Sequence, residues 1–261
     1  MSLIQKTSRA LLIVSFIGAA LLYYLLPPVW QLKEGPIEVT RWPKSGQQTF
    51  MIGPDQQRWT PFQLLSRHLV NAVVVSEDAR FYSHQGIDWI EIRKSLILNI
   101  AEQRYARGAS TITQQLVKMA FLTSDKTLLR KIRESLGALL LEQLISKSDI
   151  LTWYLNLVPF GDGVFGAEAA ASHYFNTSAE LLTIQQSTHL ALVLPSPNVW
   201  SEGLRNKQLT EFGHKRYRHI IERLYEQKFI TQTLMQAALK TGNFGGAIRE
   251  EASVNETGTE D

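Results

Sequence analysis

The stretch Glu77-Asp78-Ala79-Arg80-Phe81-Tyr82-Ser83-His84-Gln85-Gly86 follows closely on a short apolar run, Ala72-Val73-Val74-Val75. A carboxylate at the end of a buried run is partly desolvated. Desolvation raises its pKa toward the range in which an acid or base works near neutral pH. Glu77 and Asp78 are neighbours, so on a helix their side chains point about 100° apart, and we take Glu77 as the one that faces a cleft. By itself the stretch also fits a helix end with two solvated acids and an aromatic anchor.

The composition is that of a globular protein with a packed core. The chain has 261 residues, of which 44% are hydrophobic and 20% charged. The absence of cysteine excludes disulfide frameworks, thiolate nucleophiles and cysteine-based zinc sites. From Arg249 onward one arginine stands against five acidic residues, so that stretch carries −4 and the rest carries +7 of the net +3. We expect a cationic folded body that favours phosphates, a membrane surface or nucleic acid, and a disordered tail.

An apolar stretch near the N-terminus is long enough to cross a membrane. Residues 10–30 are uncharged, and these 21 residues are roughly the length that spans a hydrocarbon core. Lys6 and Arg9 precede the stretch without any acid, which predicts a cytoplasmic N-terminus and a body on the outer side. The alternative is a cleaved signal peptide ending at Gly18-Ala19-Ala20, but six further apolar or aromatic residues follow and favour an uncleaved anchor.

The remaining chain is predicted to be mainly α-helical. Residues 31–60 are rich in Pro and Gly and predict an extended, irregular connector, and no run of alternating strand residues appears. Apolar residues at helix spacing predict helices over 62–77, 89–100, 112–120, 127–145, 151–157, 164–175, 179–194, 207–226 and 231–239. We divide the chain into an N-terminus (1–9), an anchor (10–30), a connector (31–57), a helical domain (58–245) and an acidic tail (246–261).

A second polar cluster spans residues 107–118. Either Ser110 or Thr111 can cap the helix that starts there. Polar side chains then follow at a spacing of four residues and share one helix face: Ser110, Gln114 and Lys118. Together with the positive end of the helix dipole, this stripe of hydroxyl, amide and ammonium groups suits a phosphate or sugar ligand. The alternative is a solvated helix face with a good cap.

A third cluster repeats the same spacing with charged residues. Lys126, Arg130 and Glu134 are again four residues apart, with Lys131 and Arg133 beside them. Such a face can hold a pyrophosphate and a divalent metal, or it can form ordinary surface ion pairs worth about 0.2–1 kcal/mol each. Taken by itself, the pattern favours the ion pairs.

A fourth cluster, residues 153–171, combines a glycine-rich loop with a helix of small residues. Gly161, Gly163 and Gly166 predict a tight loop, and the alanines of 167–171 allow close helix packing. We interpret this segment as the wall of a groove rather than as a source of catalytic groups.

Taken together, the four clusters resemble a known family. The motifs are EDxRFYxHxGID at 77–88, GASTITQQLVK at 108–118, RKxRE at 130–134 and YLNxxxFGxGxxGxEAAxxxYF at 154–175. This set resembles the peptidoglycan glycosyltransferases (family 51) over roughly residues 58–226, and no Ser-x-x-Lys motif of a transpeptidase occurs. The resemblance implies a mainly α, lysozyme-like helical glycosyltransferase domain behind a single transmembrane helix, as in the monofunctional, membrane-anchored members.

The resemblance also implies roles for individual residues. Glu77 matches the catalytic base, which takes a proton from the 4-hydroxyl of the acceptor N-acetylglucosamine. Glu134 matches a second catalytic glutamate near the donor pyrophosphate and is the expected ligand of Mg²⁺ or Mn²⁺. The basic positions that neutralise the leaving pyrophosphate correspond to Lys118, Lys126 and Arg130. The positions that line the donor site correspond to Ser110, Thr111, Gln114 and Gln115.

The implied partners are lipid II, the nascent glycan strand and the membrane, with division or elongation proteins as further candidates. The implied location is the inner membrane, with the catalytic domain on its outer side. A tethered enzyme meets a lipid-linked substrate at high local concentration. An apolar patch for the bilayer could come from Leu96, Ile97, Leu98 and Ile100 or from Phe121-Leu122, although we expect the first group to be ordinary core.

Two other functions are compatible with such a fold. A lytic, lysozyme-like enzyme also uses a catalytic glutamate, but it has no pyrophosphate to hold and does not need the basic cluster. A non-catalytic scaffold of the wall-synthesis machinery has no need for the charged motif residues. Nucleic acid is not an expected partner, because the basic residues lie among carboxylates and amides rather than aromatic side chains.

Overall fold

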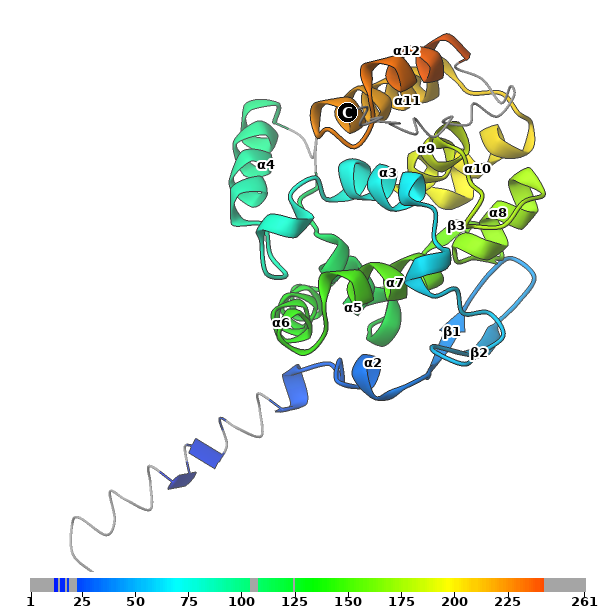
Figure 1. The fold of residues 1–261 in the computed structure, drawn as a ribbon. Helices are drawn as coiled ribbons and strands as arrows, with labels where there is room; N and C mark the ends of the chain where they lie inside the picture. Colours follow the sequence, from blue (N-terminus) through cyan, green and yellow to red (C-terminus); the bar gives the residue numbers. More distant parts are fainter. Residues whose placement is uncertain are drawn as a thin grey trace, which may run out of the picture. The chain divides into compact units, whose positions relative to one another are not determined.

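The computed structural model describes residues 12–13, 15–16, 18, 23–103, 108–123 and 125–241. The chain forms two compact units, one of residues 1–62 and 80–158 and the other of residues 63–79 and 159–261. Most of the described residues in regular structure are helical, which confirms the mainly α prediction (Figure 1). Several predicted segments lie outside the described residues: the N-terminus (1–9), much of the anchor (10–30), Arg107 and the acidic tail (246–261). Within the described ranges, no helix combines the length and hydropathy that a membrane span needs.

The first unit begins with a short helix and a hairpin where we predicted an irregular connector. Its elements are α2 (Gln31–Glu34), β1 (Ile37–Arg41), β2 (Gln48–Ile52), η2 (Phe81–Ser83), α4 (Trp89–Ala101), α5 (Ile112–Phe121), α6 (Leu128–Leu144) and α7 (Lys147–Leu157). Strands β1 and β2 pair antiparallel, with Ile37 opposite Ile52. The prediction of no strands was wrong here, because only the inward residues Ile37, Val39 and Ile52 are buried and two such short strands give a weak alternating pattern.

Helix α5 forms the centre of the first unit. It packs against both α6 and α7 (Figure 1). Its fully buried Ile112, Leu116 and Val117 lie on one side of the helix, as the sequence period predicts. Helix α7 is buried from Ile150 to Leu157, and Asn156 there donates to the carbonyl of Thr60 and accepts from the amide of Thr60, both at 2.8 Å. The fourth motif thus ties the connector to the core.

The second unit is built on α3. Its elements are α3 (Arg67–Glu77), β3 (Pro159–Gly161), β4 (Val164–Phe165), α8 (Ala167–Phe175), α9 (Ile184–Val193), α10 (Pro197–Arg205), α11 (Glu211–Glu226) and α12 (Gln232–Thr241), and η1 (Phe62–Leu64) precedes α3 at the border of the two units. Helix α3 packs against α9 and α11 through its buried valines. The sequence analysis missed α10, a short helix that Pro197 starts at its first turn.

The glycine-rich loop of the fourth motif is a tight β-hairpin. Gly163 and Gly166 have φ of 75° and 85°, which side chains other than glycine rarely adopt. A Cβ at Gly161 would come within 2.3 Å of the Tyr174 hydroxyl, which itself donates to the Phe160 carbonyl at 3.0 Å. With Ala167, Ala170 and Ala171 buried in α8, the packing interpretation of this cluster fits the structure.

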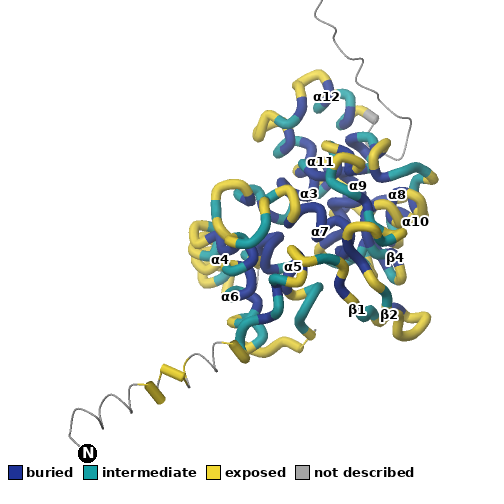
Figure 2. Tube along the Cα trace, turned by 60° about the horizontal axis from the view of Figure 1, so that its bottom comes forward, coloured by how far each residue is buried: buried dark blue, intermediate teal, exposed yellow. Residues whose placement is uncertain are grey.

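Helix α4 differs from the other helices because its apolar residues are exposed (Figure 2). Within α4 only Ser95 is buried. The exposed large hydrophobic residues are Trp89, Ile90, Leu96, Ile97, Leu98 and Ile100. Our expectation that Leu96, Ile97, Leu98 and Ile100 form ordinary core was wrong, because no other element covers this side of the helix among the described residues. The start of α6 is similar, with Leu128 78% and Leu129 51% exposed.

Candidate active site

Glu77 is the last residue of α3, and a cationic side chain lies near its carboxylate. Its side chain is only 10% exposed, in keeping with the desolvation expected from sequence. The Ser76 hydroxyl lies 3.4 Å from Glu77 Oε1, and Arg216 Nη2 of α11 lies 3.7 Å from the same oxygen. Asp78 follows as the C-cap, with its amide donating to the Val74 carbonyl at 2.9 Å. All of these residues belong to the second unit.

The rest of the first motif belongs to the first unit and forms a turn fixed on α6. Arg80 Nε donates to Asp88 Oδ2 at 3.0 Å, and Phe81 is fully buried. At Gly86, φ is +86° and an added Cβ would lie 2.7 Å from the Ala138 carbonyl oxygen. The Gly86 carbonyl in turn accepts a 2.6 Å hydrogen bond from the Thr111 hydroxyl. The first motif therefore determines where the second begins.

The second motif starts α5 with a capping box. Thr111 is the N-cap: its hydroxyl oxygen accepts from the Gln114 amide at 3.1 Å, and Gln114 Oε1 accepts from the Thr111 amide at 3.0 Å. Gln114 Nε2 also donates to Ser135 Oγ of α6 at 3.0 Å. Thr111 and Gln114 are both 2% exposed, so their described contacts hold helices together. The predicted stripe is incomplete, because Ser110 lies before the helix.

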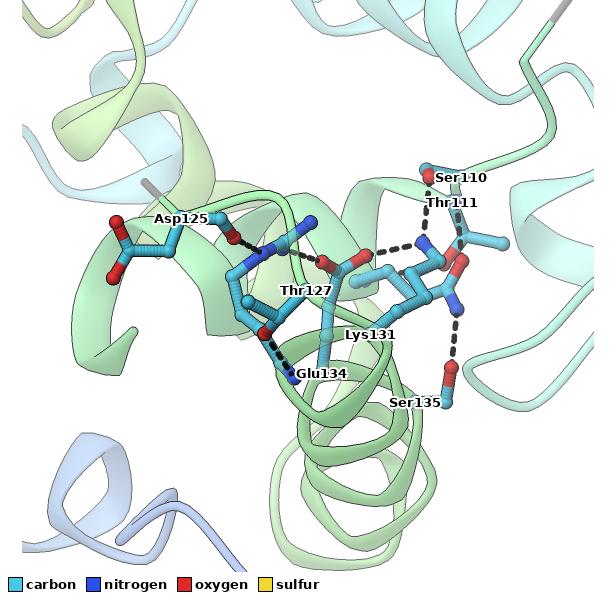
Figure 3. Close-up of polar contacts among 9 residues, drawn as sticks. Ser110, Thr111, Asp125, Thr127, Lys131, Glu134 and Ser135 are labelled. Carbon is cyan, nitrogen blue, oxygen red and sulfur yellow. Dashed lines mark hydrogen bonds and ion pairs between the residues drawn. The ribbon is translucent and has the colours of Figure 1, made fainter. Parts of the chain in front are cut away.

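The third motif forms a buried carboxylate between two cations (Figure 3). The Glu134 side chain on α6 is 3% exposed, and its two oxygens each lie 2.5 Å from a cation, Arg130 Nη1 and Lys131 Nζ. Lys131 Nζ also donates to Ser110 Oγ at 2.8 Å, which links the second motif to the third. Arg130 Nε donates to the Asp125 carbonyl. The arrangement places the Lys131 ammonium and the Ser110 hydroxyl beside the N-terminus of α5, where the helix dipole also favours an anion.

Two predicted basic residues are exposed to solvent. Lys126 precedes α6, which starts after its N-cap Thr127, and is exposed. The predicted helical series of Lys126, Arg130 and Glu134 was therefore wrong at its first member. Lys118 lies on α5 and is exposed. Gln115 is half-buried, and its Oε1 accepts a hydrogen bond from the Tyr154 hydroxyl at 3.1 Å.

Sequence reasoning did not single out Lys131 and Arg216. Lys131 replaces Lys126 as the second cation at Glu134, and the turn that starts α6 at Thr127 is the reason. The spacing of three residues from Lys131 to Glu134 is a usable signal, because i,i+3 neighbours share a helix face. Arg216 is 139 positions away from Glu77, and nothing in its local sequence distinguishes it from Lys215 or Arg218.

The residues at Glu134 do not fit a resident divalent metal as they are arranged. Both carboxylate oxygens accept from cations, so an ion would have to displace Arg130 or Lys131 and would meet their positive charge. Divalent magnesium prefers several oxygen ligands, and the described cluster offers one carboxylate. The requirement for Mg²⁺ or Mn²⁺ remains a prediction from the resemblance.

Comparison with known proteins agrees with the motifs. The family model described as "Transglycosylase" matches residues 45–225. A protein of Dechloromonas aromatica called "Biosynthetic peptidoglycan transglycosylase" is 39% identical over 217 residues, which are 78% of this chain and 90% of the relative. The chain belongs to the transglycosylase family.

Further relatives of this transglycosylase carry the same name. A protein of Nitrosomonas eutropha is 43% identical over 169 residues, covering 65% of this chain and 68% of the relative. One of Nitrosomonas europaea is 46% identical over 145 residues, covering 56% and 59%. The matched range contains all four motifs, so the family resemblance predicted from them is confirmed. The roles of the individual site residues remain predictions.

Proposed function

We propose that this transglycosylase polymerises peptidoglycan glycan strands from lipid II. The growing strand is the donor and lipid II is the acceptor. The 4-hydroxyl of the acceptor N-acetylglucosamine attacks C1 of the donor N-acetylmuramic acid, a new glycosidic C–O bond forms, and the bond to undecaprenyl pyrophosphate breaks. The anomeric centre is inverted in this single displacement. The observation that carries the proposal is the cluster of Arg130, Lys131 and Ser110 around buried Glu134 in a chain of this family.

The two glutamates have environments that suit different roles. Glu134 has a cation at each oxygen, at 2.5 Å, and is poorly placed to accept a proton. Instead it holds Arg130 and Lys131 in position for the leaving pyrophosphate, which is where negative charge develops. Glu77 has a looser cationic neighbour at 3.7 Å and is the better general base for the acceptor hydroxyl.

The other predicted residues divide into supporting and contacting groups. Thr111 and Gln114 are buried in the cap of α5 and position Ser110 and the helix N-terminus for the donor phosphates. Lys118 and Lys126 are exposed cations that attract the anionic substrate and add to its binding. Arg130 and Lys131 carry further N–H donors beyond those used for Glu134.

The test offers purified full-length protein two substrates separately, lipid II and finished glycan. We expect a glycan polymer from lipid II and no fragments from finished glycan. Release of muropeptides without polymer would instead identify the lytic alternative. Glu77→Gln should abolish polymerisation while leaving the fold intact by circular dichroism. Full polymerisation by this variant would reject Glu77 as the base.

We also propose that the chain works as a single-pass protein of the inner membrane with its catalytic domain on the outer side. The apolar residues exposed on α4 and at the start of α6 support contact with the bilayer. The C-terminal end of the predicted anchor (10–30) packs on α6: Arg133 Nε donates to the Leu25 carbonyl at 3.1 Å, and a Cβ at Gly137 would lie 2.5 Å from Pro27. This close packing ties the exit of the anchor to the unit that holds Glu134.

The membrane proposal is tested by comparing activity on lipid II in vesicles and in detergent. Changing Leu96, Ile97 and Ile100 together to Asp should lower the vesicle rate about tenfold relative to the detergent rate, because charge opposes insertion of α4. Leu181→Asp is the matched control, since Leu181 is 68% exposed in the second unit. Equal losses in vesicles and detergent would argue against a membrane-contacting α4.

A further inference from the structure

Glu77 occupies an unfavourable position for an ionised carboxylate. It is the last residue of α3, whose negative dipole end favours cations rather than anions. Its side chain is also largely removed from water. Both effects work against the charged form. A general base must be ionised before the reaction, so a compensating group is needed.

Arg216 of α11 supplies a positive charge at this point. Helix α11 packs on α3, and Arg216 Nη2 lies 3.7 Å from Glu77 Oε1. The same Nη2 donates a hydrogen bond to Ser76 Oγ at 3.1 Å. The Ser76 hydroxyl carries one proton, and it lies 3.4 Å both from Glu77 Oε1 and from the Ala191 carbonyl. One guanidinium nitrogen therefore contacts the carboxylate and the adjacent hydroxyl together.

The guanidinium is itself held in place from a second side. Its carbon lies 5.5 Å from the centre of the Trp200 ring, within the range of a cation–π interaction. The Arg216 side chain is 25% exposed. Burial lowers the pKa of Arg216, and the Glu77 carboxylate opposes that shift. A partly buried arginine that stacks on an aromatic ring has few other orientations available.

The other helix packed on α3 carries one titratable side chain, His189 of α9. Its Nδ1 lies 2.7 Å from the Gln185 carbonyl, and its ring packs on Tyr217. Burial lowers the pKa of His189 to about 4, so it is neutral over the working range. The residue that follows Glu77, the C-cap Asp78, is a buried acid. Arg216 is thus a cation of α11 that lies close to the Glu77 carboxylate.

We propose that Arg216 is a positioning residue for Glu77, which keeps the carboxylate ionised and oriented through direct charge and through Ser76. This inference rests on the proposed function, in which Glu77 is the general base. Because the ion pair is longer than those at Glu134, the carboxylate remains able to accept a proton. The inference assigns a catalytic consequence to a residue of α11, outside the four motifs.

The experiment measures steady-state polymerisation of lipid II by the full-length protein across a series of pH values. Arg216→Met keeps the length of the side chain and removes its charge. We expect kcat near neutral pH to fall about tenfold, with KM within about twofold of the wild type, since orientation and charge of the base are lost. In the pH profile of kcat for Arg216→Met, the acidic limb should shift by about one pH unit to higher pH. The difference in kcat between the wild type and Arg216→Met should therefore become smaller at high pH.

Two variants separate charge from structure. Arg216→Lys retains a cation and should restore the acidic limb to its wild-type position. Arg218→Met removes an exposed arginine from the same helix and should leave the profile unchanged. A loss of kcat in Arg216→Met that is equal at all pH values, with no shift of the limb, would indicate a merely structural role and overturn the inference.

Ser76→Ala provides an independent test should Arg216→Met fold poorly. It removes the hydroxyl between Arg216 and Glu77 and should lower kcat several-fold without moving the limb, since the charge remains. Unchanged kcat in Ser76→Ala contradicts the proposed orientation. Glu77→Gln distinguishes the two levels of the argument. If the wild-type protein makes no polymer from lipid II, the proposed function fails. If Glu77→Gln is active, Glu77 is not the base; if it is inactive while Arg216→Met has a wild-type profile, only the role of Arg216 fails.

Discussion

Replacing Gly86 with Ala should destabilise the first unit, because this glycine brings the first motif against α6. Its φ of +86° is one that alanine adopts only with strain, at about 1–2 kcal/mol. An added Cβ would lie 2.7 Å from the carbonyl oxygen of Ala138, 2.8 Å from its carbonyl carbon and 3.0 Å from the Leu139 amide nitrogen. All three are backbone atoms, so the turn must move away from the helix.

The two effects add to a free-energy loss of about 3 kcal/mol. Overpacking of this kind typically costs about 1–3 kcal/mol beyond the strain. Movement of the turn also lengthens the 2.6 Å hydrogen bond from the Thr111 hydroxyl to the Gly86 carbonyl. At about 2–4 °C for each kcal/mol, the melting temperature of the full-length protein should fall by about 6–12 °C.

Gly46→Ala is the matched control for this prediction. Gly46 has φ of +110°, but an added Cβ meets no atom within 4 Å. This variant therefore experiences the backbone strain without the clash and should lose about 1–2 kcal/mol. Differential scanning fluorimetry in detergent compares the two. A Gly86→Ala melting temperature no lower than that of Gly46→Ala would refute the argument that close contact with α6 excludes a side chain.

Three further predictions concern the site and its surroundings. Glu134→Gln should lower the polymerisation rate by about 100- to 1,000-fold, because Arg130 and Lys131 lose the carboxylate that holds them. The control Glu211→Gln breaks an exposed pair with Lys215 and should leave the rate unchanged, so similar rates for the two variants would contradict the role assigned to Glu134. Thr111→Ala should lower the free energy of unfolding by about 1–2 kcal/mol, because it removes the cap of α5 and the hydrogen bond to the Gly86 carbonyl. A denaturant titration measures this change, and a value within a few tenths of a kcal/mol of the wild type would show that the cap is dispensable. The free energy of unfolding should fall by about 3 kcal/mol as the pH decreases from 6.5 to 4. The reason is that His189 is protonated in the unfolded chain at its ordinary pKa of 6.5, whereas burial lowers its pKa to about 4 in the folded protein. His189→Gln should lack this pH-dependent loss, and identical pH dependences of the wild type and the variant would contradict the prediction.

The sequence alone was sufficient for most of the helices and for the family. Apolar residues at helix spacing predicted α3, α4, α5 and α6, because local periodicity is a property of neighbouring residues. The cap of α5 was narrowed to Ser110 or Thr111, since a cap acts over three positions, and the structure places Thr111 there. The four motifs indicated the transglycosylase family because their residue types and order are specific even without coordinates.

The tertiary structure decided which side chains meet. It replaced Lys126 with Lys131 at Glu134, because the start of α6 lies after Lys126. It also directed Gln114 into a cap and a contact with Ser135. The apolar residues of α4 are exposed although their spacing is that of a core helix. Periodicity identifies a helix and its apolar face, but what covers that face, and whether Arg216 reaches Glu77, depends on contacts between segments far apart in the chain.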